Sequence, residues 1–174
     1  AIVGDAAKQR YKLLGTDIED VKKELLEVNN LALEGKPEDM VITSHICRGN
    51  YHSTFFTSGP YDSVADYVFA KENVDALFLE YDDARSGGFA PLAKVSPDKK
   101  VVLGLITTKT PQLEEKEVVI KRIHEAAKYI PLDRLYLSPQ CGFASCEIGN
   151  KLTEEEQWAK LKLVKEIAEE VWGE

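Results

Sequence analysis

The chain has 174 residues, of which 44% are hydrophobic and 30% are charged, a balance typical of a soluble globular domain. Lys and Arg together number 22 and Asp and Glu 30, so the formal net charge is −8. A surface of this charge repels phosphate groups, which argues against nucleic acid and anionic membranes as partners. No apolar run approaches the about 18–20 residues that span a bilayer, and no secretory signal pattern opens the chain.

The three cysteines are too few for a disulfide framework and odd in number. We therefore expect free thiols, available for metal binding or catalysis, in a reducing, cytoplasmic compartment. The chain begins at Ala1, and its single methionine is Met40. We expect either a processed chain or a segment of a longer gene product.

Apolar residues alternate along the chain between helical spacing and short strand-like runs. Thr16 to Glu19 has the pattern of a capping box, and the helical spacing that follows it ends at Gly35. The later predicted elements are a strand over 40–44, a turn over 58–62, a helix over 63–72, a strand over 75–80, a long loop over 82–100, a strand over 101–106, a helix from Thr110-Pro111 to about 129, a strand over 134–138 and a last helix that opens with a capping box at 153–156.

Helical spacing also predicts which face of each helix is buried. The predicted core positions are Ile18, Val21, Leu25, Val28 and Ala32 in the first helix, Val118, Ile120, Ile123 and Ala127 in the third, and Trp158, Leu161, Val164, Ala168 and Val171 in the last.

One helix followed by four strand–helix units predicts an α/β fold with a parallel sheet and right-handed crossovers. Four such units form either a small open sheet or half of an eight-stranded barrel. A complete barrel of this type takes about 250 residues, so the chain is too short to close one alone.

Polar residues that could bind a metal follow three of the predicted strands. In parallel α/β folds, chemistry collects at the carboxyl ends of the strands. His45 and Cys47 are two residues apart and therefore point to the same face of an extended chain. Glu80 and Cys141 follow two other strands. One nitrogen, two sulfurs and one oxygen are an acceptable ligand set for Zn²⁺.

Two alternatives to this metal site remain open from the residues alone. Cys47 and Cys141 could be small buried hydrophobic residues, and His45 a hydrogen-bonded core histidine. Cys146 competes with Cys141 as a ligand, since it follows five residues later. We favour Cys141 because Cys146 falls beyond the strand, in a loop or turn.

Weaker candidates lie near the same strand ends, and each also has a plain structural explanation. Asp82 and Asp83 could act as acid and base or lie on a solvated loop, and Lys109 could face the site or the solvent. The run Ser86-Gly87-Gly88 does not fit a phosphate-loop spacing. The other candidates are Tyr51 with His52 as pocket-lining residues, and His124 on the outer surface of a helix.

The ordered set of His45-Ile46-Cys47, Glu80 and Pro139-Gln140-Cys141-Gly142 resembles the cobalamin-independent methionine synthase family, and most closely its short, single-barrel bacterial members. The resemblance covers about residues 37–172. It implies the C-terminal half of a TIM (β/α)8 barrel, with the whole chain as one partial domain. It also implies that His45, Cys47, Glu80 and Cys141 bind catalytic zinc.

The resemblance further implies the reaction, which is transfer of a methyl group from a methylated folate to homocysteine, giving methionine without cobalamin. Zinc would stabilise the homocysteine thiolate, with Glu80 as the most labile ligand. The family places a histidine, proposed as an acid, where Lys109 falls. Lys109 is therefore a candidate catalytic residue. Asp82, which follows the second strand, is another, and Asn50 and Tyr51 are candidate substrate contacts.

The resemblance leaves half of an eight-stranded barrel unaccounted for, and an isolated half exposes two sheet edges. We expect a truncated chain, a homo-oligomer, or pairing with the missing N-terminal half. We consider three alternative hypotheses for the function. The chain is the zinc-bearing half of a methyltransferase, a non-catalytic zinc-binding module that acts only after assembly, or a zinc hydrolase with Asp82 as its base.

Overall fold

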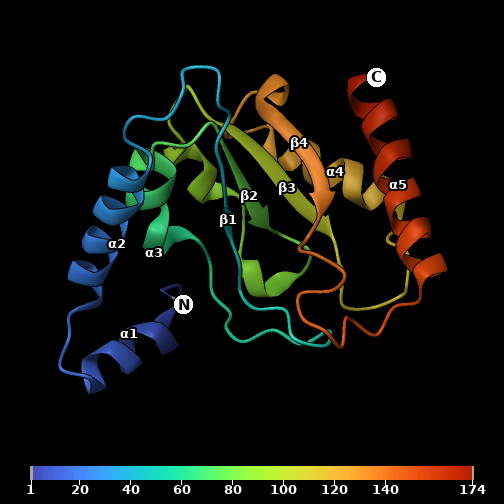
Figure 1. The fold of residues 1–174 in the computed structure, drawn as a ribbon. Helices are drawn as coiled ribbons and strands as arrows, with labels where there is room; N and C mark the ends of the chain where they lie inside the picture. Colours follow the sequence, from blue (N-terminus) through green and yellow to red (C-terminus); the bar gives the residue numbers. More distant parts are fainter. Residues whose placement is uncertain (1, 174) are drawn as a thin grey trace.

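The computed structural model of the chain describes residues 2–173 (Figure 1). The helices are α1 (Asp5–Leu13), α2 (Ile18–Ala32), α3 (Asp62–Val64), α4 (Lys116–Ala126) and α5 (Glu154–Trp172). The strands are β1 (Thr43–Ile46), β2 (Ala76–Glu80), β3 (Lys100–Ile106) and β4 (Leu135–Pro139). A π-helical turn, Ala65–Phe69, continues α3, and 3-10 turns cover Ala84–Ser86, Ala90–Lys94 and Leu132–Arg134. No helix within 2–173 has both the length and the apolar character needed to cross a membrane.

The four strands form one parallel sheet in the order β1-β2-β3-β4. Each crossover leads to the adjacent strand, which is the winding of a barrel and not of a doubly wound sheet. In Figure 1, α2 and α3 lie beside β1, and α4 and α5 lie beside β4. The predicted α/β fold with parallel strands is confirmed. Within the described residues, β1 and β4 are the edges of the sheet.

The outer face of the sheet, which packs against the helices, holds most of the core. Leu77 and Leu103 on this face are fully buried, and Ile123 of α4 and Ile167 of α5 belong to the same apolar cluster. In β3 every residue after Lys100 is buried, as expected of a strand in a parallel sheet.

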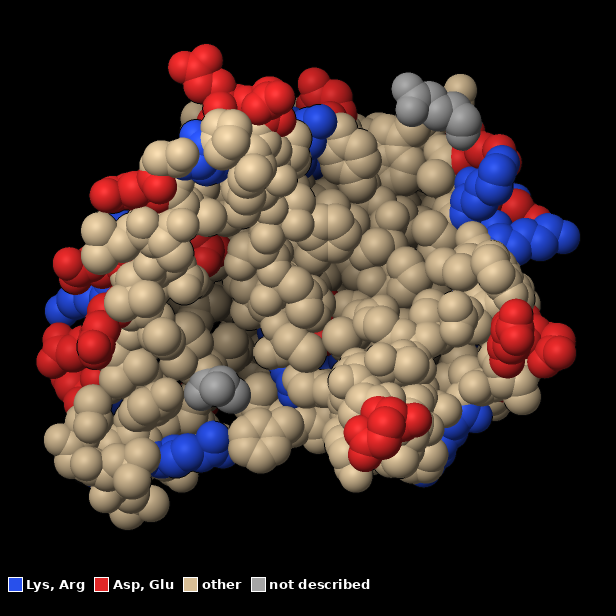
Figure 2. Space-filling view, viewed as in Figure 1, with Lys and Arg blue, Asp and Glu red and all other residues tan. Residues whose placement is uncertain are grey.

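The inner face of the sheet, which lines the interior of the half-barrel, is open in part, although Val102 on it is buried. Alternation along the strands puts His45, Phe78, Val102 and Tyr136 on this face, where the register places them side by side. Tyr136 is 40% exposed. A hollow of about 390 Å³ lies here and runs up to the end of β4. Figure 2 shows a surface that is largely uncharged across its middle, with acidic side chains mostly toward its margins.

Two predicted helix starts are wrong. The first predicted helix is α2, which comes after α1 in the structure. It is capped by Asp17, whose side chain accepts the backbone N–H of Glu19, so there is no capping box at Thr16. The helix predicted from Thr110 begins only at Lys116. The chain stays irregular between these two residues although Thr110-Pro111 is a favourable local start. The capping box at the start of α5 is confirmed.

Several predicted core positions are also wrong. Val118 is 49% exposed, and its neighbour Val119 is buried instead. Trp158 is 60% exposed, while Lys160 is fully buried two residues later. In α2, the predicted core residues Leu25 and Val28 are 42% and 55% exposed. Ile18 and Ile123 are buried as predicted.

Candidate metal centre

The first strand lies later in the chain than predicted. β1 covers Thr43–Ile46 instead of 40–44, so His45 lies inside the strand and Cys47 directly follows it. The two-residue spacing still brings both side chains to one side, since both belong to the same cluster of potential ligands. The local shift therefore leaves the predicted site intact.

The side chains of His45, Cys47, Glu80 and Cys141 converge at the carboxyl ends of β1, β2 and β4. One ligand atom from each lies within 4.8 Å of the others. The two sulfurs are 3.9 Å apart, and His45 Nε2 is 3.7 Å from Glu80 Oε1. Ligand atoms of a tetrahedral zinc site are about 3.3–3.8 Å apart, given zinc–ligand bonds of about 2.0–2.3 Å. The donor set therefore fits Zn²⁺, and the separations of 3.7 and 3.9 Å lie at or just above the upper end of this range. Within 2–173 the cluster does not include Cys146.

The imidazole of His45 is oriented for metal binding. Its Nδ1 lies 3.2 Å from the carbonyl oxygen of Phe78, on the adjacent strand. A carbonyl oxygen only accepts hydrogen bonds, so Nδ1 carries a proton. In the neutral ring Nε2 then keeps a free lone pair, whereas in the protonated ring Nε2 donates to the Cys141 sulfur. Such a bond on the far nitrogen is the usual support of a metal-binding histidine.

The carboxylate of Glu80 is buried and held through both oxygens. The backbone N–H of Arg48 donates to Oε2 at 2.8 Å, and the side-chain amide of Gln140 donates to Oε1. The side chain is 0% exposed, and burial raises the pKa of Glu80 above its usual value. A bound cation would favour the ionised form.

A buried arginine and a tyrosine join the ends of β1 and β2. The guanidinium of Arg48 donates to the carbonyl oxygens of Glu80 and Gly59 and lies 3.9 Å from the ring centre of Tyr61. The Tyr61 hydroxyl donates to the carbonyl oxygen of Ile46 and accepts the N–H of Glu80. Sequence reasoning missed both residues. The only signal was the position of Arg48, directly after the His-x-Cys motif.

The two cysteines of the cluster, Cys47 and Cys141, differ in their affinity for a proton. Hydrogen bonds from the Cys47 thiol and from His45 lower the pKa of Cys141, because a thiolate there accepts both. The same contact raises the pKa of Cys47, and bonding to the Cys141 sulfur raises the pKa of His45. The two cysteines thus lose their first proton readily. Loss of the second proton would place two negative sulfurs side by side, which a bound cation would stabilise.

Lys109 and Asn50 lie together at the edge of the ligand cluster. Lys109 Nζ donates to Asn50 Oδ1 at 3.2 Å and to Gln140 Oε1 at 3.3 Å. Burial lowers the pKa of Lys109. The Asn50 amide donates to Gly142 O and Ser145 Oγ, both at 2.8 Å, so it ties the loop after β1 to the loop after β4.

Asp82 and Tyr51 have no hydrogen bond or ion pair to the four ligands within 2–173. The side chain of Asp82 is 0% exposed, and one oxygen accepts from Arg85 Nη2 at 2.7 Å. Its other oxygen is buried without a hydrogen-bond partner among the described residues. Tyr51 is 62% exposed on the loop after β1. Their roles as catalytic and substrate-binding residues stay predictions.

The remaining weaker candidates lie in loops or on the surface. His52 Nδ1 lies 3.1 Å from the carbonyl oxygen of Gly149, which joins two loops, and Asp83 pairs with Arg85. Ser86 is buried, and His124 is exposed on α4 as predicted.

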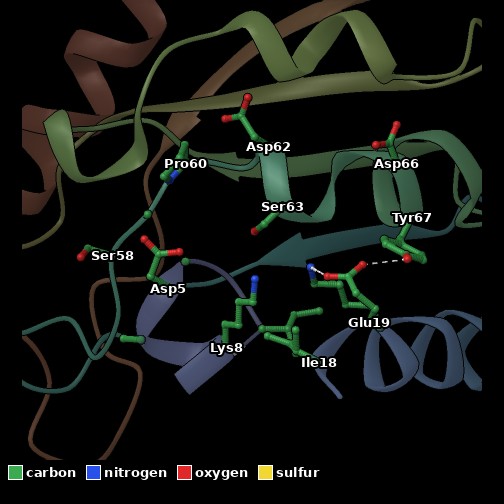
Figure 3. A pocket seen from close by; sticks show the side chains of 15 residues that line it. Asp5, Lys8, Ile18, Glu19, Ser58, Pro60, Asp62, Ser63, Asp66 and Tyr67 are labelled. Atoms are coloured by element: carbon green, nitrogen blue, oxygen red, sulfur yellow. Dashed lines mark hydrogen bonds and ion pairs between the residues drawn. The ribbon is translucent and has the colours of Figure 1, made fainter. Parts of the chain in front are cut away.

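A larger cavity, of about 720 Å³, lies elsewhere, between α1, α2 and α3. Figure 3 shows Ser63 of α3 pointing toward α1, which carries Asp5 and Lys8, while the carboxylate of Asp62 points away from them. Glu19 lines it too and is engaged by Lys22 and the hydroxyl of Tyr67. None of the four ligands lines this cavity. The metal cluster instead borders the hollow on the inner face, which His45 and Cys141 line.

A parallel half-barrel with this ligand set at its strand ends is typical of a metal-binding barrel enzyme. A family model described as "Cobalamin-independent synthase, Catalytic domain" matches residues 21–170, and the chain belongs to this family. The predicted resemblance is confirmed.

Relatives of this chain support both the family and the fold. The uncharacterized protein YxjH of Bacillus subtilis is 52% identical over 169 residues, which are 97% of this chain and 45% of YxjH. A Listeria monocytogenes structure, provisionally assigned as a vitamin B12-independent methionine synthase, is 42% identical with a TM-score of 0.71 over 92% of this chain and 44% of that one. The 5-methyltetrahydropteroyltriglutamate–homocysteine methyltransferase of Bacillus licheniformis is 25% identical over 97% of this chain and 20% of its own length.

The chain thus spans less than half the length of YxjH and of the Listeria protein. Its four-stranded sheet corresponds to half of the barrel of the solved relative, which confirms the predicted half-barrel fold.

Proposed function

We propose that the chain is the zinc-bearing half of a cobalamin-independent methyltransferase. The complete protein would transfer a methyl group from a methylated folate to the thiol of homocysteine, giving methionine. The convergence of His45, Cys47, Glu80 and Cys141 on one point carries this proposal. Membership of the family and the name of the B. licheniformis relative support the substrates.

The four converging residues would hold the metal. Bound Zn²⁺ supplies a Lewis acid that keeps the substrate thiol in its nucleophilic thiolate form near neutral pH. His45 offers Nε2, since its Nδ1 is engaged by a carbonyl oxygen. Glu80 is the residue whose bond to the metal we expect to weaken when the substrate sulfur arrives, while Arg48 and Gln140 would keep its carboxylate in place.

Lys109 is the proposed acid. Its ammonium carries the proton on Nζ, between the amide oxygens of Asn50 and Gln140. Burial lowers its pKa, so this proton leaves more readily than that of a solvated lysine. Asn50 would orient Lys109. Tyr51 would contact the substrate from the exposed loop, and Asp82 would act through its partner Arg85.

The first test is the metal content of the reduced protein, together with zinc-edge X-ray absorption in the presence and absence of homocysteine. We expect about one zinc per chain and one additional sulfur neighbour at about 2.3 Å when homocysteine is added. A folded, reduced protein that stays metal-free after incubation with zinc contradicts the proposal.

A second candidate is a non-catalytic zinc-binding module. The free edges of the sheet and the limited coverage of YxjH favour it. Coexpression with the part of YxjH that this chain does not match separates the two candidates. Methionine formation by the assembled pair supports the methyltransferase, whereas zinc binding without methionine formation supports the module.

The hydrolase is the weakest of the three functions. Its proposed base, Asp82, is bound to Arg85 and fully buried, which keeps it from a bound water. Ester hydrolysis by the zinc-loaded protein in the absence of any thiol would support the hydrolase hypothesis.

A further inference from the structure

Gln140 links two parts of the candidate site that have no direct contact. It directly follows β4 and is 2% exposed. Its backbone N–H donates to the carbonyl oxygen of Ile106 at 2.7 Å. The side chain lies between Glu80, a proposed metal ligand, and Lys109, the proposed acid.

The backbone places Gln140 there through a close approach to β3. A Cβ atom at Gly104 would lie 2.9 Å from both Gln140 Cα and the carbonyl oxygen of Leu79. Real Cβ atoms are essentially never this close to backbone. The pairing of β3 with β4 is also irregular between Gly104 and Ile106. Irregularities of this kind commonly re-aim a side chain next to a functional site.

The chemistry of its neighbours fixes the orientation of the Gln140 amide. The Lys109 ammonium can only donate, so the oxygen Oε1 must face it, 3.3 Å away. The Thr108 hydroxyl donates to the same oxygen at 3.0 Å. The amide nitrogen is therefore left to face Glu80 and donates to its Oε1.

That same Glu80 oxygen faces the other ligands, since it lies 3.7 Å from His45 Nε2. The second oxygen, Oε2, accepts the backbone N–H of Arg48. Gln140 thus donates a hydrogen bond to the oxygen that faces the other proposed ligands. A rotation of the carboxylate away from the metal would break this bond.

We infer that Gln140 is a positioning residue, which aims Glu80 Oε1 at the metal and couples this ligand to Lys109 through one amide group. This inference rests on the proposed function for the zinc ligands and for the acid. Gln140 touches neither metal nor substrate, so its effect appears in the affinity and geometry of the site.

The test replaces Gln140 with methionine, which has a similar volume but cannot donate or accept these bonds. Zinc affinity is measured by competition with a chelator, and the ligand geometry by the absorption spectrum of the cobalt-substituted protein. We expect Gln140→Met to bind zinc about 10- to 100-fold more weakly, with an altered cobalt spectrum. Unchanged affinity and spectrum would overturn the inference.

Two control variants isolate the contact with Glu80. Gln112→Met makes the same change at an exposed position and should leave zinc affinity within about twofold of the wild type. Thr108→Val removes the hydroxyl bonded to Oε1 but keeps the bond to Glu80, so it should retain the cobalt spectrum. An equal loss of affinity in Thr108→Val would assign the effect to general packing and contradict the inference.

Two further measurements separate this inference from the proposed function. The melting temperature of the metal-free protein should be the same in Gln140→Met and the wild type within a few degrees, since a larger drop would indicate a merely structural role. A wild type that binds zinc but never forms methionine after assembly contradicts the methyltransferase alone. A wild type that binds no zinc contradicts both.

Discussion

The two faces of the sheet differ in what covers them. On the outer face, Leu77 and Leu103 are fully buried beneath helices. On the inner face, Tyr136 is 40% exposed, and the ligand cluster borders an open hollow. Folding stability therefore resides mainly on one face, and the chemistry lies along the rim of the other. Changes to one face should leave the other largely intact, and the predictions below test this separation.

The largest expected effect is on metal binding. Cys141→Ser should reduce zinc from about one per chain to near zero, because it removes one of two thiolates from the ligand cluster. The unfolding free energy of the metal-free chain should change by less than about 1 kcal/mol. Elemental analysis and urea denaturation measure the two quantities. Cys146→Ser is the matched control, and loss of zinc there with retention in Cys141→Ser would refute the ligand assignment.

The opposite experiment disturbs the outer face. Leu103→Ala should lower the unfolding free energy by about 2–5 kcal/mol, because it leaves a cavity in the centre of the core. The fraction that remains folded should keep its zinc. Val118→Ala changes a side chain that is 49% exposed and should cost less than about 0.5 kcal/mol. A loss of zinc from folded Leu103→Ala protein would show that the faces are not separate.

Gly104 is the exception that should couple the two faces. Gly104→Ala forces Gln140 or Leu79 to move, so we expect a loss of about 1–3 kcal/mol in stability. Because Gln140 is displaced from Glu80, zinc should bind about tenfold more weakly as well. Denaturation and chelator competition test both effects. A loss of stability without a change in zinc affinity would limit Gly104 to packing.

A smaller effect is expected at the start of α5, which carries none of the four proposed ligands. Thr153→Ala removes the side chain that accepts the Glu156 N–H and should cost about 1 kcal/mol. Thermal unfolding with and without zinc should give the same difference. Thr110→Ala, at the rejected helix start, should have no such cost.

The smallest effect is expected on the inner face away from the ligands. Tyr136→Ser should change the unfolding free energy of the chain by no more than about 1 kcal/mol, since much of the ring is already in water. Urea denaturation tests this value. A cost comparable to that of Leu103→Ala would mean that the inner face is covered in solution.

The local sequence pattern predicted the secondary structure well where it favoured strand clearly over helix. The apolar runs over 75–80 and 101–106 are strands because a parallel sheet covered by helices buries them. The convergence of His45, Cys47, Glu80 and Cys141 was predictable because chemically distinctive residues follow strand ends, and their role as metal ligands stays a prediction. The number of strand–helix units left a small open sheet or half of a barrel, and the family resemblance then indicated the half-barrel.

The misses depend on contacts between distant residues. The helix expected at Thr110 is delayed because Glu114 instead accepts the backbone N–H of Thr107 and pairs with buried Lys160. No local pattern predicts a fully buried lysine, since its partner is 46 residues away. The role of Arg48 was invisible for the same reason, because its partners are Gly59, Tyr61 and Glu80.

The edge position of β1 has a thermodynamic consequence. This strand carries His45 and leads directly to Cys47, yet within the described residues it pairs only with β2. A strand that docks on its free edge would therefore also order two of the proposed ligands. Coupled binding free energies are reciprocal, so such docking would strengthen metal binding by the same factor by which the metal strengthens docking. Docking at this edge would then respond to the concentration of free zinc.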